Sequence, residues 1–538
     1  MYAVRLTESY FPAQADGPFE SLTIGDMLRR SAHKYGDSLA LCEILADGTR
    51  GREWSFTRLL ADAERLGRAL ASRHEKGARI AVWANNIPEW ILLELGAAFA
   101  GLTLVTVNPS YQARELDFVL RQSRAEALYY VAEVRGNPLA AIADKVCAGL
   151  PAIRHRILLT DHETLYAGAD RGALPATAPR EPVQIQYTSG TTGFPKGALL
   201  HHEGLVQNSR DTVYRSGIRE GDRFIHYMPL FHTTGCAILA LGALNIGATM
   251  FLAPAFDPAL AVRLIERERA TFLFGVPTMI VAMIEEALKS GRDMSSLRGA
   301  MSGGAMVAPE LVRKARDVFG VTVQIVYGQT EASPVITQAW AEDSIDDLTQ
   351  TIGQPLPHVE LSIRDPRTNR VLPVGEQGEI CARGYLVMTG YNDNPEATAK
   401  TLDAEGWLHT GDLGRIDERG YVRITGRVKE MIIRGGENLF PAEIENAMLE
   451  HEAVAEVAVV GVPCPVYGEQ VACFMRAKTE TRPEPAALKK FIRERLSAQK
   501  TPLYWIWVDA WPLTGSGKIQ KFRLVEGFEK GEHETLQA

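Results

Sequence analysis

The chain has 538 residues, of which 46% are hydrophobic and 23% are charged. This is the composition of an ordinary globular protein, and the length favours more than one domain. The net charge is −8, with acidic and basic residues interspersed, which argues against a nucleic-acid partner. Six scattered cysteines without metal-binding spacing indicate free thiols, and the N-terminus has no apolar signal segment, so we expect a cytoplasmic protein.

The first half of the chain alternates predicted helices with short apolar strands. Apolar residues at helical spacing predict a helix over 55–71. Further strands and helices follow in alternation, which predicts an α/β fold with doubly wound, mostly parallel sheets. The predicted strands are 80–83, 104–107 and 128–131, and the predicted helices between them are 88–99 and 111–121.

An uncharged stretch over 233–256 is long enough to cross a membrane. However, Asn245, Ile246 and Gly247 interrupt it, and Pro254 ends it. We therefore predict a buried helix over 235–244, a turn and a buried strand over 248–252, and no transmembrane segment.

The pattern changes near residue 361, where short strands are separated by turn residues. Strands predicted over 359–363, 378–383 and 420–424 indicate a small β-barrel-like unit that closes a large domain. A hinge-like stretch over 426–430 follows. The last part, with a helix over 441–450, a strand over 454–460 and a helix over 485–498, is a separate α+β domain. We place the large domain at 1–427 and the small, mobile domain at 428–538.

A loop rich in glycine and hydroxyl groups separates two strand-like runs at 184–186 and 198–200. This loop, 187–197, reads YTSGTTGFPKG. Glycine allows the backbone to approach a ligand, and hydroxyls, backbone N–H groups and Lys196 can all bind anionic oxygens. The spacing is not that of a Walker A loop, because no Ser or Thr follows the lysine. The loop therefore predicts a different kind of nucleotide phosphate site.

The same loop resembles the phosphate-loop signature of the adenylate-forming superfamily, which contains acyl- and aryl-CoA synthetases, luciferases and peptide-synthetase adenylation domains. Four further segments match the family pattern in its order, and the resemblance extends from about Trp54 to the end of the chain. The matching segments are 229–232 (PLFH), 327–331 (YGQTE), 406–412 (GWLHTGD) and 512–518 (PLTGSGK).

The resemblance implies that a carboxylate reacts with ATP to give an acyl-adenylate. Glu331 is the expected ligand of Mg²⁺, Thr188 and Thr330 are expected to donate to the phosphates, and Lys518 to bridge the carboxylate and the α-phosphate. In similar enzymes His232 lines the carboxylate end of the acyl pocket. The other expected nucleotide-binding residues are Ser189, Gly190, Thr191, Thr192 and Gly193 at the phosphates, Gly303, Gly304, Ala305 and Tyr327 at the adenine, Asp412 and Arg427 at the ribose, and Gly328, Gln329 and Ile424 without an assigned subsite.

In related enzymes the small domain then rotates, and coenzyme A attacks the adenylate. Lys429 occupies the hinge position, and Gly435, Gly436 and Asn438 are expected in the wall of the pantetheine tunnel. Segments 434–443 and 518–522 look most like those of medium-chain fatty acyl-CoA synthetases.

We therefore expect an ATP-dependent, AMP-forming acyl-CoA ligase that uses ATP, Mg²⁺ and coenzyme A. Its substrate is expected to be a medium-chain fatty acid, because Ala237, Ala240, Gly242 and Ala243 leave room in an uncharged helix. A branched, cyclic or aryl acid, transfer to a carrier protein, and a homodimer all stay open.

Overall fold

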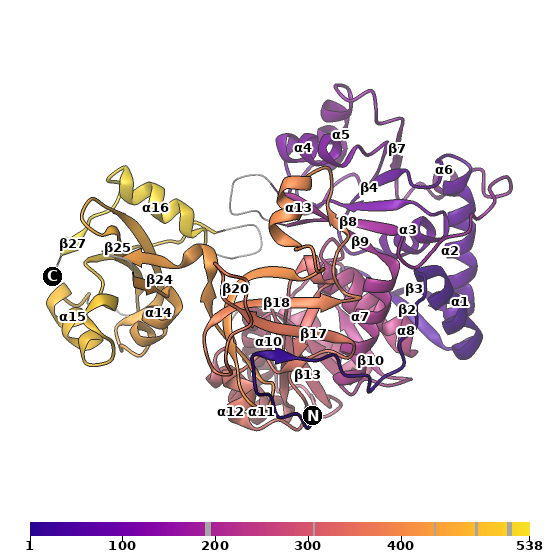
Figure 1. Cartoon of the computed structure of the whole chain (residues 1–538). Helices are drawn as coiled ribbons and strands as arrows, with labels where there is room; N and C mark the ends of the chain where they lie inside the picture. Colours follow the sequence, from indigo (N-terminus) through magenta and orange to yellow (C-terminus); the bar gives the residue numbers. More distant parts are fainter. Residues whose placement is uncertain (189–194, 305–306, 435–436, 479–481, 514–518, 538) are drawn as a thin grey trace.

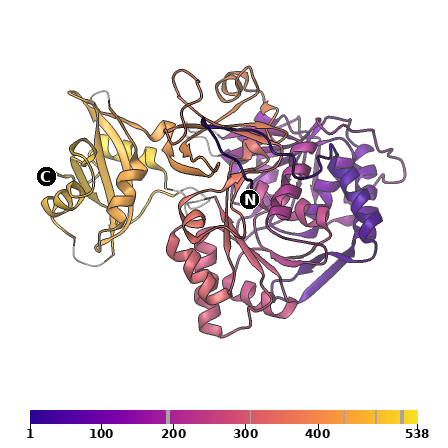
Figure 2. The same ribbon diagram turned by 60° about the horizontal axis from the view of Figure 1, so that its bottom comes forward.

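The computed structural model describes residues 1–188, 195–304, 307–434, 437–478, 482–513 and 519–537, with the side chains of 429, 433, 437 and 438 outside that description. A large domain contains three sheets, and a smaller domain at the C-terminal end contains a fourth (Figure 1). After a turn of the view the small domain still lies to one side of the large one (Figure 2). The predicted α/β class is confirmed.

One sheet of the large domain has seven strands in the order β19-β9-β8-β5-β4-β6-β7. Its centre is parallel, whereas β8 and β9 form an antiparallel hairpin and β19 adds to β9 from far along the chain. The strands are β4 (Arg79–Trp83), β5 (Thr103–Thr106), β6 (Ala127–Tyr130), β7 (His155–Leu158), β8 (Pro182–Thr188), β9 (Lys196–His201) and β19 (Gly390–Tyr391). The helices of this region are α2 (Phe56–Ala71), α3 (Pro88–Phe99), α4 (Ala113–Ser123), α5 (Leu139–Cys147) and α6 (His162–Tyr166).

The second sheet has nine strands in the order β16-β15-β14-β13-β12-β10-β11-β2-β3, parallel from β14 to β2 and antiparallel at both ends. The strands are β2 (Leu39–Ile44), β3 (Arg50–Ser55), β10 (Arg223–His226), β11 (Thr249–Leu252), β12 (Phe272–Phe274), β13 (Gly299–Gly303), β14 (Val323–Gly328), β15 (Val335–Gln338) and β16 (Gln354–Pro355). The helical segments of this region are α1 (Ile24–Tyr35), α7 (His202–Arg215), η1 (Thr234–Leu241), α8 (Gly242–Ile246), α9 (Pro258–Glu268), α10 (Pro277–Ser290), α11 (Pro309–Phe319), η2 (Thr330–Ala332) and α12 (Ile345–Gln350).

The third sheet is antiparallel, with the order β1-β17-β18-β20-β21. In the described residues it is an open sheet with β1 and β21 at its edges. Its strands are β1 (Tyr10–Phe11), β17 (Val359–Arg364), β18 (Gly378–Gly384), β20 (Leu408–Ile416) and β21 (Val422–Arg427), and α13 (Pro395–Thr401) lies in the same stretch of chain. β21 begins two residues after the predicted strand and extends into the expected hinge, because Arg427 pairs with Asp412 of β20.

In its described residues the small domain has a six-stranded sheet and three α-helices. The predicted helix over 485–498 ends at Arg493, and a separate 3₁₀ turn begins after Ser497. The strands are β22 (Ile432–Arg434), β23 (Glu437–Leu439), β24 (Val454–Cys464), β25 (Gly468–Ala477), β26 (Tyr504–Trp507) and β27 (Leu536–Gln537). The helical segments are η3 (Val428–Glu430), α14 (Pro441–Leu449), α15 (Pro485–Arg493), η4 (Ala498–Lys500) and α16 (Lys521–Glu529).

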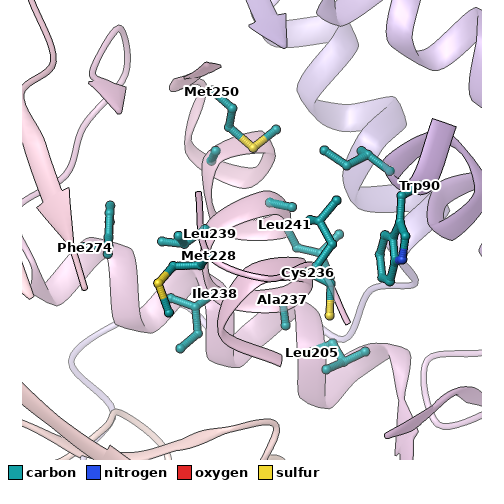
Figure 3. Packing of buried hydrophobic residues seen from close by; sticks show 14 of the residues in the cluster. Trp90, Leu205, Met228, Cys236, Ala237, Ile238, Leu239, Leu241, Met250 and Phe274 are labelled. Atoms are coloured by element: carbon teal, nitrogen blue, oxygen red, sulfur yellow. The ribbon is translucent and has the colours of Figure 1, made fainter. Parts of the chain in front are cut away.

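The centre of the large domain is packed around η1, the first part of the uncharged stretch. Figure 3 shows Trp90 of α3, Leu205 of α7, Met250 of β11 and Phe274 of β12 around the labelled η1 residues Cys236, Ala237, Ile238, Leu239 and Leu241. α3 is buried along its whole length, and most of its residues are apolar although it also carries the buried Glu89 and Glu94. η1 is a π-helix and α8 continues from it. Of the described helices, none combines the length and apolar character that crossing a membrane requires.

Candidate active site

The β8–β9 hairpin holds both ends of the predicted phosphate loop. Thr188, the last residue of β8, pairs with Lys196, the first residue of β9, and the Thr188 hydroxyl lies 3.4 Å from the carbonyl oxygen of Lys196. The ammonium of Lys196 lies 4.9 Å from the ring centroid of Tyr391 in β19. Ser189, Gly190, Thr191, Thr192 and Gly193 lie outside the described residues.

Three predicted nucleotide-binding residues form one network at the end of β14. The buried Tyr327 hydroxyl donates to Oδ2 of Asp412 over 2.8 Å, and Nε of Arg427 lies 2.9 Å from Oδ1 of the same carboxylate. Burial and the nearby Asp412 charge raise the pKa of Tyr327 well above its ordinary value, so the phenol stays protonated and acts as a donor. Tyr327 and Arg427, which are far apart in the sequence, therefore both contact the carboxylate of Asp412.

The glycines beside this network are fixed by close backbone contacts. A Cβ on Gly328 would lie 1.9 Å from the carbonyl oxygen of Pro334, and a Cβ on Gly303 would lie 2.6 Å from that of Val326. Gly304 has a φ of +77°, and a Cβ there would lie in ordinary contact with Cγ1 of Val276 at 3.8 Å. Gly303 and Gly328 thus have a structural reason to be glycine besides the predicted contact with adenine. Gln329 and Thr330 are partly exposed beside them, Ile424 of β21 is 40% exposed, and Ala305 lies outside the described residues.

Glu331, the predicted magnesium ligand, is buried in the short η2 turn that follows β14. Its Oε1 accepts a 2.7 Å hydrogen bond from the hydroxyl of Tyr391. Among the described residues no donor is recorded for its Oε2. One anchored and one available carboxylate oxygen suit a hard divalent cation, which takes one or two protein carboxylates when it also binds nucleotide phosphates. The residues present therefore fit magnesium.

The predicted acyl helix presents two kinds of surface. His232, at its entrance, is exposed and lies against Phe231 with ring centroids 4.4 Å apart. Gly242, in contrast, does not line an open pocket: a Cβ there would lie 2.7 Å from Cγ1 of Val213 in α7. The prediction that Gly242 makes room for the acyl tail is wrong, because this glycine allows two helices to approach each other.

A buried polar cluster lies beneath the same helix and was not found from the sequence. Oε1 of Glu94 accepts a hydrogen bond from Gln184 over 2.5 Å. Nε2 of Gln186 donates to Gln184 over 3.0 Å and lies 3.3 Å from the Cys236 sulfur. Burial raises the pKa of Glu94 to about 8, so this carboxyl is protonated at neutral pH.

His409, three residues before Asp412, is held between two carboxylates. Its Nδ1 lies 2.8 Å from Oε2 of Glu379 and its Nε2 lies 3.5 Å from Oδ2 of Asp403. Hydrogen bonding to Glu379 raises the pKa of His409. Because carboxylates face both ring nitrogens of His409, we interpret the nearby Glu379–Cys381–His409 group as an ion-pair cluster.

In the described part of the small domain, the start of α16, just after the predicted loop 512–518, is linked to the expected hinge. Nζ of Lys521 lies 2.7 Å from Oε2 of Glu430 in η3 and 2.8 Å from Oε1 of Glu445 in α14. Lys429 lies in η3 and Asn438 in β23 by backbone alone. Lys518, Gly435 and Gly436 lie outside the described residues.

This fold and site define a two-domain α/β protein with the β8–β9 hairpin, a Tyr–Asp–Arg network and a helix-lined apolar centre. The model of the family described as AMP-binding enzyme matches residues 28–392, and that of the AMP-binding enzyme C-terminal domain matches residues 443–518. The chain belongs to this family, and the resemblance stated above is confirmed.

Similar proteins narrow the class further. The chain is 36% identical to a putative acyl-CoA synthetase, YngI, of Bacillus subtilis, over 94% of this chain and 96% of that protein. It is 34% identical to the human mitochondrial medium-chain acyl-CoA ligase ACSF2, over 97% of this chain and 90% of that protein.

Two solved structures share the fold. ATP-bound MatB of Rhodopseudomonas palustris is 30% identical, with a TM-score of 0.83, and the match covers 94% of this chain and 99% of that one. The o-succinylbenzoate CoA synthetase of Bacillus subtilis with its acyl-adenylate is 27% identical, with a TM-score of 0.80, and the match covers 93% of this chain and 97% of that one. The chain is thus an AMP-forming acyl-CoA ligase.

Proposed function

We propose that this ligase activates a medium-chain fatty acid in two steps. In the first, a carboxylate oxygen attacks the α-phosphorus of ATP, the bond to the β-phosphate breaks, and pyrophosphate leaves. In the second, the thiol sulfur of coenzyme A attacks the acyl carbon, AMP leaves, and the thiol loses its proton. The Tyr327–Asp412–Arg427 network is the observation that carries the first step.

Electrostatics explain the assignment of roles in the first step. Two anions must meet, so catalysis needs cations and donors that are already in place. Lys196 and Thr188 would bind the phosphates, Glu331 would hold magnesium, and Lys518 would bridge the carboxylate and the α-phosphate. Magnesium, when bound, would offset phosphate charge. Asp412 and Arg427 would bind the ribose.

The acyl preference rests on the apolar centre of the large domain. η1 carries no charged residue, and its residues 235–241 are all buried, so no cation is offered there to a second carboxylate. The medium-chain name of ACSF2 supports the same choice. The second candidate is an aryl or cyclic acid, which the likeness to the o-succinylbenzoate enzyme favours.

A panel of carboxylates tests the proposal. Thioester formation should be measured by mass spectrometry with acetate, butyrate, hexanoate, octanoate, decanoate, palmitate and benzoate. Each buried methylene contributes about 0.8 kcal/mol, so kcat/KM should rise about fourfold per methylene up to octanoate or decanoate and then fall. A maximum at benzoate would favour the second candidate. Pyrophosphate release without any thioester product would reject coenzyme A as the acceptor.

A further inference from the structure

Tyr391 contacts two predicted adenylation residues that lie far from it in sequence. Its hydroxyl donates to Oε1 of Glu331 over 2.7 Å, and its ring carries the ammonium of Lys196 at 4.9 Å from the centroid. Glu331 comes from the η2 turn and Lys196 from the start of β9. One side chain therefore joins the expected metal carboxylate to the described end of the phosphate loop.

The backbone around Tyr391 is held firmly on both sides. On one side, β19 pairs with β9, with Tyr391 opposite Ala198, and the N–H of Asn392 donates to the carbonyl of Gly197 over 2.8 Å. On the other side, the Tyr391 N–H donates to Oγ1 of Thr398 over 2.9 Å. The backbone that carries the ring is therefore fixed relative to the strand that begins at Lys196.

Gly390 makes this anchoring possible. It has a φ of +152°, and a Cβ there would lie 2.9 Å from Cγ2 of Thr398. A larger residue would push away the hydroxyl that holds the Tyr391 backbone. The turn of η2 is tied to the same segment, because the N–H of Met388 donates to the carbonyl of Glu331 over 2.9 Å.

We propose that Tyr391 is a positioning residue for adenylation, which orients the Glu331 carboxylate for the metal and supports Lys196 at the phosphates. This inference rests on the proposed function. A phenol that donates to one carboxylate oxygen leaves the other oxygen for a cation and stops the group from rotating. The cation on the ring face also draws electron density from the phenol, which strengthens its hydroxyl as a donor.

The two contacts of Tyr391 can be separated by two substitutions. Tyr391→Phe keeps the ring beneath Lys196 and removes only the donor to Glu331. Tyr391→Leu removes both. Tyr10→Phe is the matched control, because Tyr10 donates to Glu360 over 2.5 Å from the edge strand β1 and so loses the same kind of bond. Circular dichroism and thermal unfolding would establish that each variant is folded.

Metal affinity is the decisive measurement. Mn²⁺ binding would be followed by electron paramagnetic resonance in the presence of α,β-methylene-ATP, which the enzyme cannot cleave. Tyr391→Phe should weaken Mn²⁺ binding about 10- to 100-fold, the usual loss when a residue that orients a metal ligand is removed, while Tyr10→Phe should bind like the wild type. Wild-type affinity in Tyr391→Phe would overturn the proposal.

The ring contact is tested without metal. With EDTA present, the affinity for α,β-methylene-ATP should be unchanged in Tyr391→Phe and about three- to tenfold weaker in Tyr391→Leu, because only the latter loses the cation–π contact. Equal affinities in the two variants would remove Lys196 from the proposal.

A double substitution separates failure of this inference from failure of the proposed function. Glu331→Ala should itself weaken Mn²⁺ binding, and adding Tyr391→Phe to it should cause no further loss, because the two residues act through one contact. If Glu331→Ala binds Mn²⁺ normally, the metal role in the proposed function fails. If Glu331→Ala weakens binding and Tyr391→Phe does not, only the positioning role fails.

Discussion

The hydroxyl of Tyr327 donates a 2.8 Å hydrogen bond to Asp412, whose other carboxylate oxygen lies 2.9 Å from Nε of Arg427. Both carboxylate oxygens are thus already engaged with protein groups. Asp412 is consequently held in one orientation by an aromatic side chain from β14 and a cation from β21. A ribose that binds there would meet a carboxylate that needs little further ordering.

Tyr327→Phe should therefore weaken ATP binding while it keeps the aromatic surface. The loss of one hydrogen bond of about 1 kcal/mol corresponds to about a fivefold higher KM for ATP. The measurement is the ATP dependence of pyrophosphate release at saturating carboxylate. Tyr421→Phe is the control, because the Tyr421 hydroxyl donates to Asp343 elsewhere in the large domain. If both variants raise the KM equally, the effect is general destabilisation and the role of Tyr327 is wrong.

The two half-reactions should be separable by substitutions in the small domain. We predict that Lys518→Ala loses adenylate formation yet still converts supplied acyl-adenylate and coenzyme A to thioester. Lys429→Pro should do the reverse, since proline fixes φ near −65° and stiffens the expected hinge. Single-turnover assays of each half-reaction would measure both. Equal loss of both steps in two folded variants would contradict a rotation between two states.

Gly242→Ala should destabilise the large domain without a specific change in acyl preference. The new Cβ would lie 2.7 Å from Cγ1 of Val213, and overpacking of a core costs about 1–3 kcal/mol. Denaturant unfolding would measure the loss, and the carboxylate panel would measure the preference. Val213→Ala in the same chain removes the clashing methyl groups and should recover part of the stability. A shift of the panel towards shorter acids would return Gly242 to the acyl pocket.

Glu94→Gln should flatten the pH dependence of stability. Burial raises the pKa of Glu94 to about 8 from an ordinary value of 4.5, so between these values the folded protein holds a proton that the unfolded chain has released. The free energy of unfolding of the wild type therefore falls as pH rises through this window, by about 1.4 kcal/mol per pH unit from this group. Glutamine is neutral throughout and can still accept from Gln184. Denaturant unfolding of both proteins at pH 5, 6, 7 and 8 gives the difference in slope, and parallel slopes would refute the buried proton.

Local signals in the sequence predicted much of the fold. Pro88 starts α3 and Ser55 caps α2, with its hydroxyl accepting from the N–H of Arg58, and both helices were predicted within one residue. β21 was displaced because Gly420 belongs to the preceding turn, with a φ of +78°, and because the pairing of Arg427 with Asp412 extends the strand. That pairing depends on tertiary structure, so the residues near Arg427 in the sequence do not indicate it.

The candidate site shows the same division. The family resemblance pointed to Tyr327, Asp412 and Arg427, and the fold brings them into contact. Their roles in the reaction stay predictions. Tyr391 was not found, because its partner Glu331 lies 60 residues away and a tyrosine after a glycine has no distinctive pattern. Gly242 was misassigned because a small residue in an apolar helix can face either a ligand or another helix, and only the position of Val213 distinguishes the two.

The apolar cores of the molecule have a consequence for how such enzymes can change. In the described part of the chain, the large core runs from Leu6 to Val422, and the two smaller cores lie between Ile432 and Leu524, with no residue in common. A mutation that reshapes the core of the large domain therefore leaves the apolar contacts within the small-domain cores intact. The large domain can therefore acquire a new substrate range while the small domain keeps its packing. For the same reason, the small domain is suited to exchange between related ligases.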